Sequence, residues 1–591
     1  MSIYENAGII NSSEKPKLPH GVIFNAYPDS IGSNLGDCID ILKQPLFKDT
    51  FSTFYILPTF FNSDLDRGFS IIDYNLNKEL VSATDIAYLK KLNIKLKLDM
   101  VLNHLSVNSP QFLDLQKNGE ASPYRDFFID WNKFWQGKGT ADNDGCIIPE
   151  DKYLQKLFTR KPGLPVIRID FKDGTKKFFW NTFYQEIIFD QVCAGDFAAL
   201  PGITLERAAE IAAAVNNAFL NKISPDQVDL GPNKEYRDQV LPVIREKRRY
   251  LGQLDLNARS AKVWEFYAET LKKLKQHGAK IIRLDAFAYL HKEAGRSNFF
   301  NRPGTWHYLE QLKKLARKED LIVFPEIHAE YGTGIHEEIA QKGYPMYDFF
   351  FPGLIIHALE YKTANPLVHW IEEIIEKDYN TINMLGCHDG IPVLDLKGKR
   401  LEDGERPGLL NDEEVDTLVD IIVERGGLIK NLYGPGGQKV SYYQVNATFF
   451  SALGEDEDKM LLARAIQLFM PGTPQVWYLD LFAGKNDYAA VEKSGSAGHK
   501  EINRTNLSLQ EIDQRLRQPV VLKQLDMIRF RNSYPAFKGT CEITEKDDPS
   551  RLKICWNMGN YKTTLSADLF SYDFEIKYTD NQGHYRLLKL S

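Results

Sequence analysis

Three carboxylates in this chain, by their type and spacing, could do chemistry. Asp285 ends the run IIRLD, Glu326 ends the run LIVFPE, and Asp389 lies in the segment CHDG. Short runs rich in β-branched and apolar residues are typical of buried parallel strands, and an α/β barrel builds its active site at the carboxyl ends of such strands. Three acids converging on one pocket indicate chemistry on a glycosidic bond.

A retaining glycosyl transfer needs an ionised carboxylate that attacks the anomeric carbon and a protonated one that gives a proton to the leaving oxygen. Asp285 and Glu326 fit these two roles, and Asp389 could hold sugar hydroxyls as positive charge develops on the ring. Arg283, two residues before Asp285 on the same strand face, is expected to keep that aspartate ionised. One such acid alone is more often a helix cap or a surface charge, so the inference depends on all three together.

The elements that must position these acids follow a βα rhythm. Strand-like segments alternate with amphipathic helical ones, which predicts an α/β fold, a (β/α)8 TIM barrel. Eight barrel strands are expected, at residues 21–27, 54–58, 96–102, 280–285, 321–326, 347–351, 381–386 and 475–478.

The gaps between the predicted strands are uneven. About 175 residues separate the third strand from the fourth, far more than a helical crossover needs, so a lobe must be inserted there. We divide the chain into a first barrel part (1–104), an inserted lobe (105–255), a second barrel part with acceptor-site loops (256–535) and a C-terminal antiparallel β domain (536–591). Within the lobe, residues 186–250 form an extra insertion, with helices expected at 205–220 and 234–250.

Composition narrows the class of protein. Of 591 residues, 43% are hydrophobic and 26% charged, as in ordinary globular proteins, and the net charge is −7. No block of like charge suggests a nucleic-acid-binding face, and the basic cluster at 245–249 is expected to be a solvated helix face. The six cysteines form no CxxC pair, so neither a disulfide framework nor a zinc site is indicated. Because residues 1–19 lack the apolar core of a signal peptide and no apolar stretch approaches 18 residues, we expect a cytoplasmic enzyme without a membrane segment.

These motifs resemble those of the α-amylase clan, glycoside hydrolase family 13, and within it the sucrose phosphorylase group. The four clan signatures match DMVLNH at 99–104, RLDA at 283–286, Glu326, and HD at 388–389. The subgroup features match YLHKEAG at 289–295, HDGI at 388–391, YQVN at 443–446, AGKND at 483–487 and INR at 502–504. The resemblance runs from about residue 21 to about residue 538.

The resemblance implies a role for each matched residue. Asp285 looks like the nucleophile, Glu326 the acid/base and Asp389 the transition-state stabiliser. The other implied sugar contacts are Asp66 and Arg504 at the far hydroxyls, His104 and His388 beside the reacting centre, Phe69 as a stacking ring, and Arg283. Taken alone, His104 could equally be a core histidine and Phe69 a core ring.

The group's reaction moves glucose from sucrose to inorganic phosphate, giving α-D-glucose 1-phosphate and fructose through a glucosyl-aspartate. Such chemistry needs cations for the phosphate and few free waters. The segment RKPGLP at 160–165 resembles the acceptor loop, in which Arg160 or Lys161 meets the phosphate, and Tyr443 with Gln444 resembles the opposing loop. No metal or organic cofactor is implied, and the small-molecule partners are the sugar and inorganic phosphate.

Two departures from the group leave alternatives open. The insertion at 186–250 has no match in the shorter phosphorylases and could be a surface arm, a lid or the contact of a homodimer. Residues 425–437 look more like relatives that act on sucrose 6′-phosphate, glucosylglycerol or glucosylglycerate. Because the three acids are shared across the fold, an α-glucosidase or transglucosylase is the alternative enzyme. An inactive binding protein would be expected to have lost an acid or to carry a membrane segment, and this chain shows neither.

Overall fold

The computed structural model describes residues 18–160, 163–171, 174–221, 223–401, 404–433, 439–545 and 547–591. For residues 187, 250, 430–433, 439–443 and 495–497 it describes the backbone alone. Lys161 therefore lies outside the described residues, and Tyr443 is described without its side chain.

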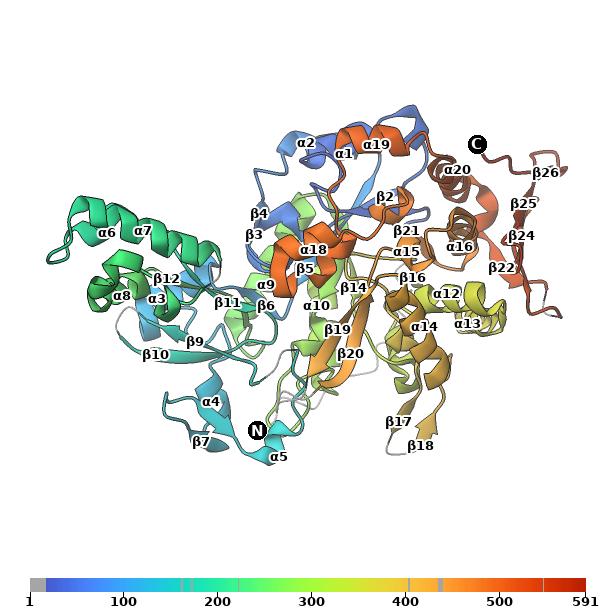
Figure 1. The fold of residues 1–591 in the computed structure, drawn as a ribbon. Helices are drawn as coiled ribbons and strands as arrows, with labels where there is room; N and C mark the ends of the chain where they lie inside the picture. Colours follow the sequence, from blue (N-terminus) through green and yellow to red (C-terminus); the bar gives the residue numbers. More distant parts are fainter. Residues whose placement is uncertain are drawn as a thin grey trace.

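Eight parallel strands form a nearly closed barrel at the centre of the molecule (Figure 1). They are β1 (Ile23–Ala26), β2 (Thr53–Ile56), β5 (Lys95–Val101), β13 (Ala279–Asp285), β14 (Ile322–Pro325), β15 (Met346–Asp348), β16 (Thr381–Asn383) and β21 (Thr473–Trp477). Their spatial order is β14-β13-β5-β2-β1-β21-β16-β15, so strands consecutive around the barrel are also consecutive in the chain. Each overlaps one of the eight predicted segments, which confirms the TIM barrel.

Helices cover the outside of the barrel because each has one apolar stripe. In α9 (Ala261–Gln276) the buried residues include Val263, Tyr267, Leu271 and Leu274, which recur every three to four positions. The other covering helices include α10 (Gly304–Lys318), α12 (Phe351–Tyr361), α13 (Asn365–Glu376), α16 (Glu457–Phe469) and α20 (Pro519–Ser533). The barrel strands themselves are almost entirely buried, as expected for strands covered on both faces.

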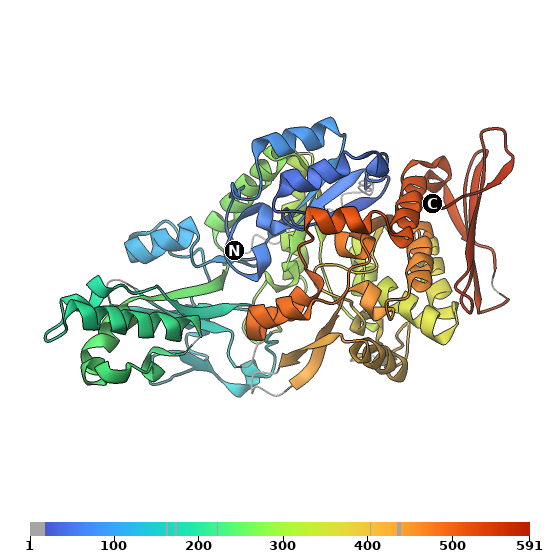
Figure 2. The same cartoon turned by 45° about the horizontal axis from the view of Figure 1, so that its top comes forward.

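The lobe inserted after β5 lies beside the barrel (Figure 2). Its base is an antiparallel sheet in the order β11-β12-β6, formed by β6 (His104–Ser106), β11 (Gln185–Phe189) and β12 (Arg248–Asp255). Because β6 follows directly on β5, this sheet is joined to the carboxyl end of a barrel strand. The inserted lobe expected from the gap length is confirmed.

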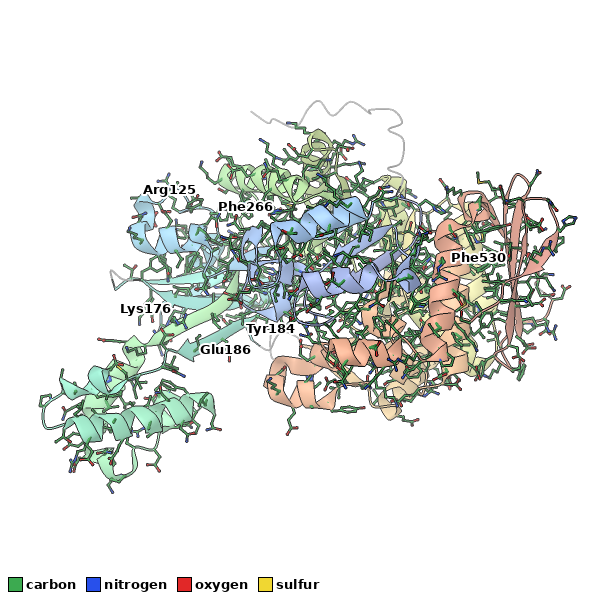
Figure 3. All side chains as sticks on the ribbon, turned by 90° about the horizontal axis from the view of Figure 1, so that it is seen from above. Arg125, Lys176, Tyr184, Glu186, Phe266 and Phe530 are labelled. Carbon is green, nitrogen blue, oxygen red and sulfur yellow. The ribbon has the colours of Figure 1, made fainter. Side chains whose placement is uncertain are left out.

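A separate helical unit stands at the far end of β11 and β12 (Figure 3). It comprises α6 (Ala194–Ala198), α7 (Leu205–Leu220) and α8 (Arg237–Glu246), and it has its own apolar core, which includes Phe197, Ile211 and Val240. The helix predicted at 205–220 is confirmed. The helix predicted at 234–250 is wrong at its end, because it stops at Glu246 and Arg248 begins a strand that pairs with Phe189.

The basic cluster at 245–249 is not a solvated helix face. It spans the end of α8 and the start of β12, and its four cations pair with acids of the same lobe: Arg245 with Asp226, Lys247 with Asp196, Arg248 with Asp170, and Arg249 with Asp190. The positive charge of the cluster is therefore paired within the lobe.

An antiparallel five-stranded sheet closes the chain, as predicted. It runs in the order β22 (Thr540–Ile543), β23 (Arg551–Met558), β24 (Tyr561–Asp568), β25 (Phe574–Thr579) and β26 (Tyr585–Leu587). It packs on the barrel side through Trp556, whose indole N–H donates to the Phe469 carbonyl at 2.8 Å. No helix in the described part of the chain is long and apolar enough to cross a membrane.

Candidate active site

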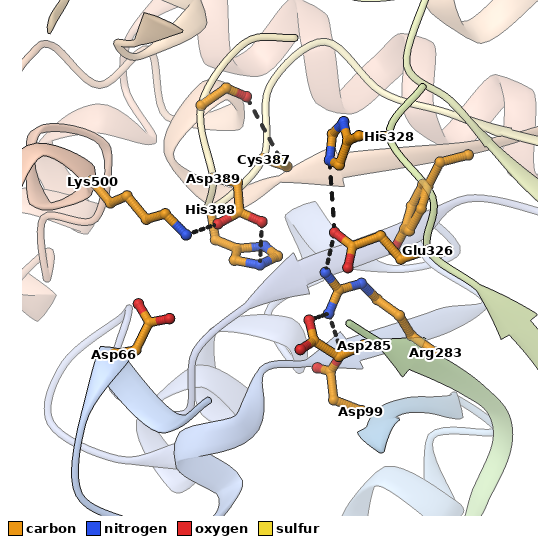
Figure 4. Close-up of polar contacts among 12 residues, drawn as sticks. Asp66, Asp99, Arg283, Asp285, Glu326, His328, Cys387, His388, Asp389 and Lys500 are labelled. Carbon is orange, nitrogen blue, oxygen red and sulfur yellow. Dashed lines mark hydrogen bonds and ion pairs between the residues drawn. The ribbon is translucent and has the colours of Figure 1, made fainter. Parts of the chain in front are cut away.

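A single buried guanidinium brings two of the three predicted acids together (Figure 4). Asp285 is the last residue of β13, and its Oδ1 lies 2.8 Å from Arg283 Nη1. Glu326 directly follows β14, and its Oε1 lies 2.6 Å from Arg283 Nη2. A further carboxylate, Asp99 of β5, contacts Nη1 at 2.6 Å. Because three neighbouring strands supply these groups, the barrel itself fixes their geometry.

The shared guanidinium acts unequally on the two acids. Burial raises the pKa of Asp285 well above its usual range, and Arg283 only partly opposes this, while Glu326 and Asp99 add repulsion. Burial also raises the pKa of Glu326, but Arg283 and His328 outweigh it and leave that pKa below the usual value.

This is the reverse of the order expected from the sequence, in which Arg283 keeps Asp285 ionised. Burial is the largest cause of the upward shift at Asp285, and the charges of Glu326 and Asp99 add to it; Asp285 shares Nη1 with Asp99, whereas Glu326 contacts Nη2. Carboxyls that share one guanidinium titrate as a coupled set, so the protonation of Asp285 and that of Glu326 depend on each other.

The third acid, Asp389, lies in the loop after β16. His388 Nε2 is 3.2 Å from its Oδ2, and Lys500 Nζ and Arg504 Nη2 are 2.5 and 3.6 Å from its Oδ1. Burial raises the pKa of Asp389, but His388 and Lys500 outweigh it and hold that pKa well below its usual range. The Asn446 amide donates to the Asp389 carbonyl at 2.7 Å, so a subgroup motif fixes the backbone here.

Asp66 and Arg504 face each other, with Arg504 Nη1 4.0 Å from Asp66 Oδ1. Asp66 and Arg67 both have left-handed backbones, with φ of 50° and 44°. Non-glycine residues in this conformation are strained and persist only where surrounding contacts hold them. Here Arg67 is held by Glu501 at 3.3 Å and by the Arg504 carbonyl at 2.5 Å, so the two segments form one unit.

Aromatic and imidazole rings line the same region. Phe69 stacks on His388 with ring centroids 5.1 Å apart and planes 11° apart, and the Arg283 guanidinium lies 5.5 Å from the Phe69 centroid. His104 Nε2 lies 3.2 Å from the Phe69 carbonyl, and its ring is 4.9 Å from that of Phe183. The predicted sugar-contact residues Phe69, His104 and His388 are thus brought together.

The predicted acceptor-loop residues are described in part. Arg160 Nη1 donates to the Tyr289 hydroxyl at 3.0 Å, and its guanidinium lies 5.2 Å from the Phe183 centroid. Gln444, on β20 (Lys439–Asn446), is only 2% exposed, and within the described part of the chain neither its amide nitrogen nor its amide oxygen has a hydrogen-bond partner. A buried amide without partners is costly, so a ligand group there would satisfy it.

Two residues of the site were missed by sequence reasoning on the Glu326 side. His328 Nε2 lies 3.7 Å from Glu326 Oε1, and its Nδ1 lies 3.3 Å from Asp395 Oδ2. Burial lowers the pKa of His328, but Asp395 outweighs it and the net shift is upward, which favours the cation beside Glu326. The signal available in the sequence was the position of His328, two residues after an acid that ends a strand.

Two further missed residues are Lys500 and Phe183, which contact Asp389 and His104 as described above. Phe183 lies in the short turn between β10 (Lys176–Trp180) and β11, and Lys500 lies on the helical turn Gly495–Asn503, so no strand pattern marks either of them.

Among the described residues, one group of side chains has the spacing of metal ligands, namely His336, Glu337 and Glu373. Lys377 Nζ lies 2.5 Å from Glu337 and 3.0 Å from Glu373, so an ammonium already neutralises the two acids. The group does not involve any of the active-site residues above.

No family model matches the sequence. A sucrose 6(F)-phosphate phosphorylase of Ilumatobacter coccineus is 51% identical over 574 residues, which span 97% of this chain and 98% of that protein. The chain belongs to the sucrose phosphorylase group of the α-amylase clan. A sucrose phosphorylase of Streptococcus mutans is 30% identical over 94% of the chain and 96% of its own length. The crystal structure of sucrose 6F-phosphate phosphorylase from Thermoanaerobacter thermosaccharolyticum superposes with a TM-score of 0.77 at 30% identity, covering 99% of both chains.

Membership of the sucrose phosphorylase group confirms the family expected from the motifs. It makes the chain an enzyme, a phosphorylase of the glycosyltransferase type.

Proposed function

We propose that this phosphorylase moves glucose from sucrose 6F-phosphate to inorganic phosphate, yielding α-D-glucose 1-phosphate and fructose 6-phosphate. The observation that carries the proposal is the pairing of Asp285 and Glu326 on one guanidinium with Asp389 beside them, in a chain that is 51% identical to a relative named for that donor. Sucrose itself, the donor expected from the motifs, is the second candidate, and the Streptococcus mutans relative supports it.

In the first step the glucosyl ring binds against Phe69, with its far hydroxyls on Asp66 and Arg504. Asp285 attacks the anomeric carbon while Glu326 gives its proton to the glycosidic oxygen, so the C–O bond to fructose breaks as the bond to Asp285 forms. Since the pKa of Asp285 is raised and that of Glu326 lowered in the free site, this step requires that donor binding leave Asp285 ionised and Glu326 protonated.

In the second step phosphate takes the place of the leaving group beside Glu326. Now ionised, Glu326 removes a proton from phosphate, whose oxygen attacks the anomeric carbon and releases Asp285 with net retention. Arg160 or Lys161, together with Tyr443 and Gln444, would bind the phosphate and exclude water. The Gln444 amide has no hydrogen-bond partner among the described residues, which supports this placement, since phosphate oxygens would accept hydrogen bonds from its N–H groups.

The test is product analysis with and without inorganic phosphate, using sucrose 6F-phosphate and sucrose as separate donors. We expect glucose 1-phosphate only when phosphate is present, and a higher kcat/KM with sucrose 6F-phosphate. Preference for sucrose would select the second candidate. Free glucose regardless of phosphate would show an α-glucosidase and refute phosphorolysis, and turnover of glucosylglycerol or glucosylglycerate alone would assign a different leaving group.

A homodimer stays a prediction, and we propose the helical unit at 190–247 as its contact. Leu205 and Leu220 of α7 expose 69% and 76% of their surfaces there. Sedimentation equilibrium of the full chain and of a Leu220→Glu variant tests it, since a dimer held by this contact would become monomeric in the variant.

A further inference from the structure

Lys500 reaches the active site from a loop remote from the catalytic strands. It lies on the helical turn Gly495–Asn503, its side chain is 12% exposed, and its Nζ is 2.5 Å from Asp389 Oδ1. Asp66 and the Tyr184 hydroxyl also lie near enough to act on its charge. Figure 4 shows Lys500 and Asp66 on one side of Asp389, with Glu326 and His328 on the other.

This placement determines which part of the substrate the ammonium faces. The leaving group and then phosphate must meet Glu326, because that residue exchanges protons with both. Lys500 lies across Asp389 from Glu326, so it faces the glucosyl ring rather than the acceptor.

We propose that Lys500 binds the 3-hydroxyl of the donor glucosyl ring. The lysine donates a hydrogen bond to the hydroxyl oxygen, while Asp389 accepts a hydrogen bond from the same hydroxyl. This assignment rests on the proposed function, in which a glucosyl unit occupies the pocket. Asp66 and Arg504 take the hydroxyls farthest from the anomeric carbon and Asp389 those nearer to it. Since Lys500 contacts Asp389 and lies near enough to Asp66 for that charge to act on it, the hydroxyl between these two groups is its target.

The chemistry of the two side chains fits a hydroxyl. An ammonium has three N–H donors, and Asp389 uses one of them. Each carboxylate oxygen of Asp389 can still accept a hydrogen bond beside the contacts it already makes. A sugar hydroxyl both donates and accepts, so an adjacent carboxylate and ammonium satisfy it completely.

A purely structural ion pair explains Lys500 less well. Arg504, which is permanently charged, has its Nη2 3.6 Å from the same Asp389 oxygen that Lys500 contacts, so Asp389 has one cation beside it even without Lys500. Burying the Lys500 ammonium is costly unless its N–H groups have hydrogen-bond partners. In this proposal, a bound sugar hydroxyl supplies a partner beside Asp389.

The experiment compares α-D-glucosyl fluoride with its 3-deoxy and 6-deoxy analogues, with phosphate as acceptor. The wild type, Lys500→Met, Lys500→Gln and the matched control Lys493→Met are measured; Lys493 is an exposed lysine of α18 (Tyr488–Ser494). For each variant, the 3-deoxy penalty is the ratio of kcat/KM for the parent fluoride to that for the 3-deoxy donor. The intrinsic effect of removing the hydroxyl is the same in every enzyme and cancels when the penalties are compared.

A hydrogen bond to a charged group contributes enough for a penalty of roughly 10-fold to 100-fold in the wild type and in Lys493→Met. In Lys500→Met we expect the parent donor to lose a similar factor and the 3-deoxy penalty to shrink severalfold. The 6-deoxy penalty should be the same in all variants, because Lys500 is assigned to the 3-hydroxyl and not to the 6-hydroxyl. A merely structural role of Lys500 would change every donor alike and would leave the 3-deoxy penalty unchanged.

An unchanged 3-deoxy penalty in an active Lys500→Met would overturn the assignment. Thermal unfolding checks that the variant is folded; if it is not, Lys500→Gln carries the same test, with a penalty expected below that of the wild type. No glucosyl transfer by the wild type from the parent fluoride would instead refute the proposed function, and this assignment with it.

Discussion

Replacing Asp99 by asparagine should move the acid limb of the kcat/KM profile to lower pH. Asp99 Oδ1 and Asp285 Oδ1 lie 2.6 and 2.8 Å from the same nitrogen of Arg283. The charge of Asp99 is therefore one of the causes that raise the pKa of Asp285. Removing that charge leaves Nη1 to Asp285 alone, so the nucleophile stays ionised at lower pH.

The size of the shift follows from this geometry. Two carboxylate oxygens that both contact one nitrogen at these distances lie about 5 Å apart at most. At an effective dielectric constant of about 20, two unit charges at that separation repel by about 3 kcal/mol. This repulsion corresponds to about two pH units. Since the asparagine amide still interacts with its neighbours, we expect an observed shift of about one to two units.

The assay uses α-D-glucosyl fluoride, which does not titrate and whose leaving group needs no proton. The acid limb of kcat/KM then reports ionisation of Asp285 in the free enzyme. Tyr55→Phe is the matched control, because the Tyr55 hydroxyl donates to Asp99 at 2.9 Å and its removal leaves both charges in place. An acid limb that stayed in place in a folded, active Asp99→Asn enzyme would refute the competition for Arg283.

Three other changes have defined outcomes. Asp285→Asn should abolish glucosyl transfer from every donor while circular dichroism and the unfolding midpoint stay near the wild type. Glu326→Gln should slow the turnover of sucrose 6F-phosphate by roughly 10²-fold to 10⁴-fold and that of glucosyl fluoride far less, since only the sugar leaving group needs a proton. Burial lowers the pKa of His104 to about 4, so the folded protein resists a protonation that the unfolded chain accepts below about 6.5. Between pH 6 and 5 the wild type should thus lose about 1.2 kcal/mol of stability more than His104→Asn does, measured by urea unfolding.

The sequence predicted the barrel well because its strands are short apolar runs whose burial on both faces leaves little ambiguity. The end of α8 was mispredicted because residues 234–250 are rich in charged residues, which favours a helix locally. What makes Arg248 and Arg249 a strand is pairing with Phe189 and Ile188, about 60 residues earlier. Long-range pairing of this kind overrides local propensity and is not visible in a local pattern.

The site was predictable where residues share a strand or a motif and unpredictable where the partners are distant. Arg283 and Asp285 are two residues apart, and their contact was expected. Asp99 lies 184 residues from Arg283, so the contact by which Asp99 competes with Asp285 for Arg283 is visible only in the fold. Lys500 lies 111 residues from Asp389 in a loop without strand or helix periodicity, and no spacing marks it as a site residue.

The shared guanidinium also explains how one glutamate can act first as an acid and then as a base. In the proposed reaction, ester formation at Asp285 removes one negative charge from the three carboxylates around Arg283. The repulsion between Asp285 and Glu326 then disappears, while Arg283 and His328 still favour the Glu326 anion. The pKa of Glu326 must therefore fall once glucose is captured. This leaves Glu326 ionised when phosphate arrives, which is the state that deprotonates the acceptor.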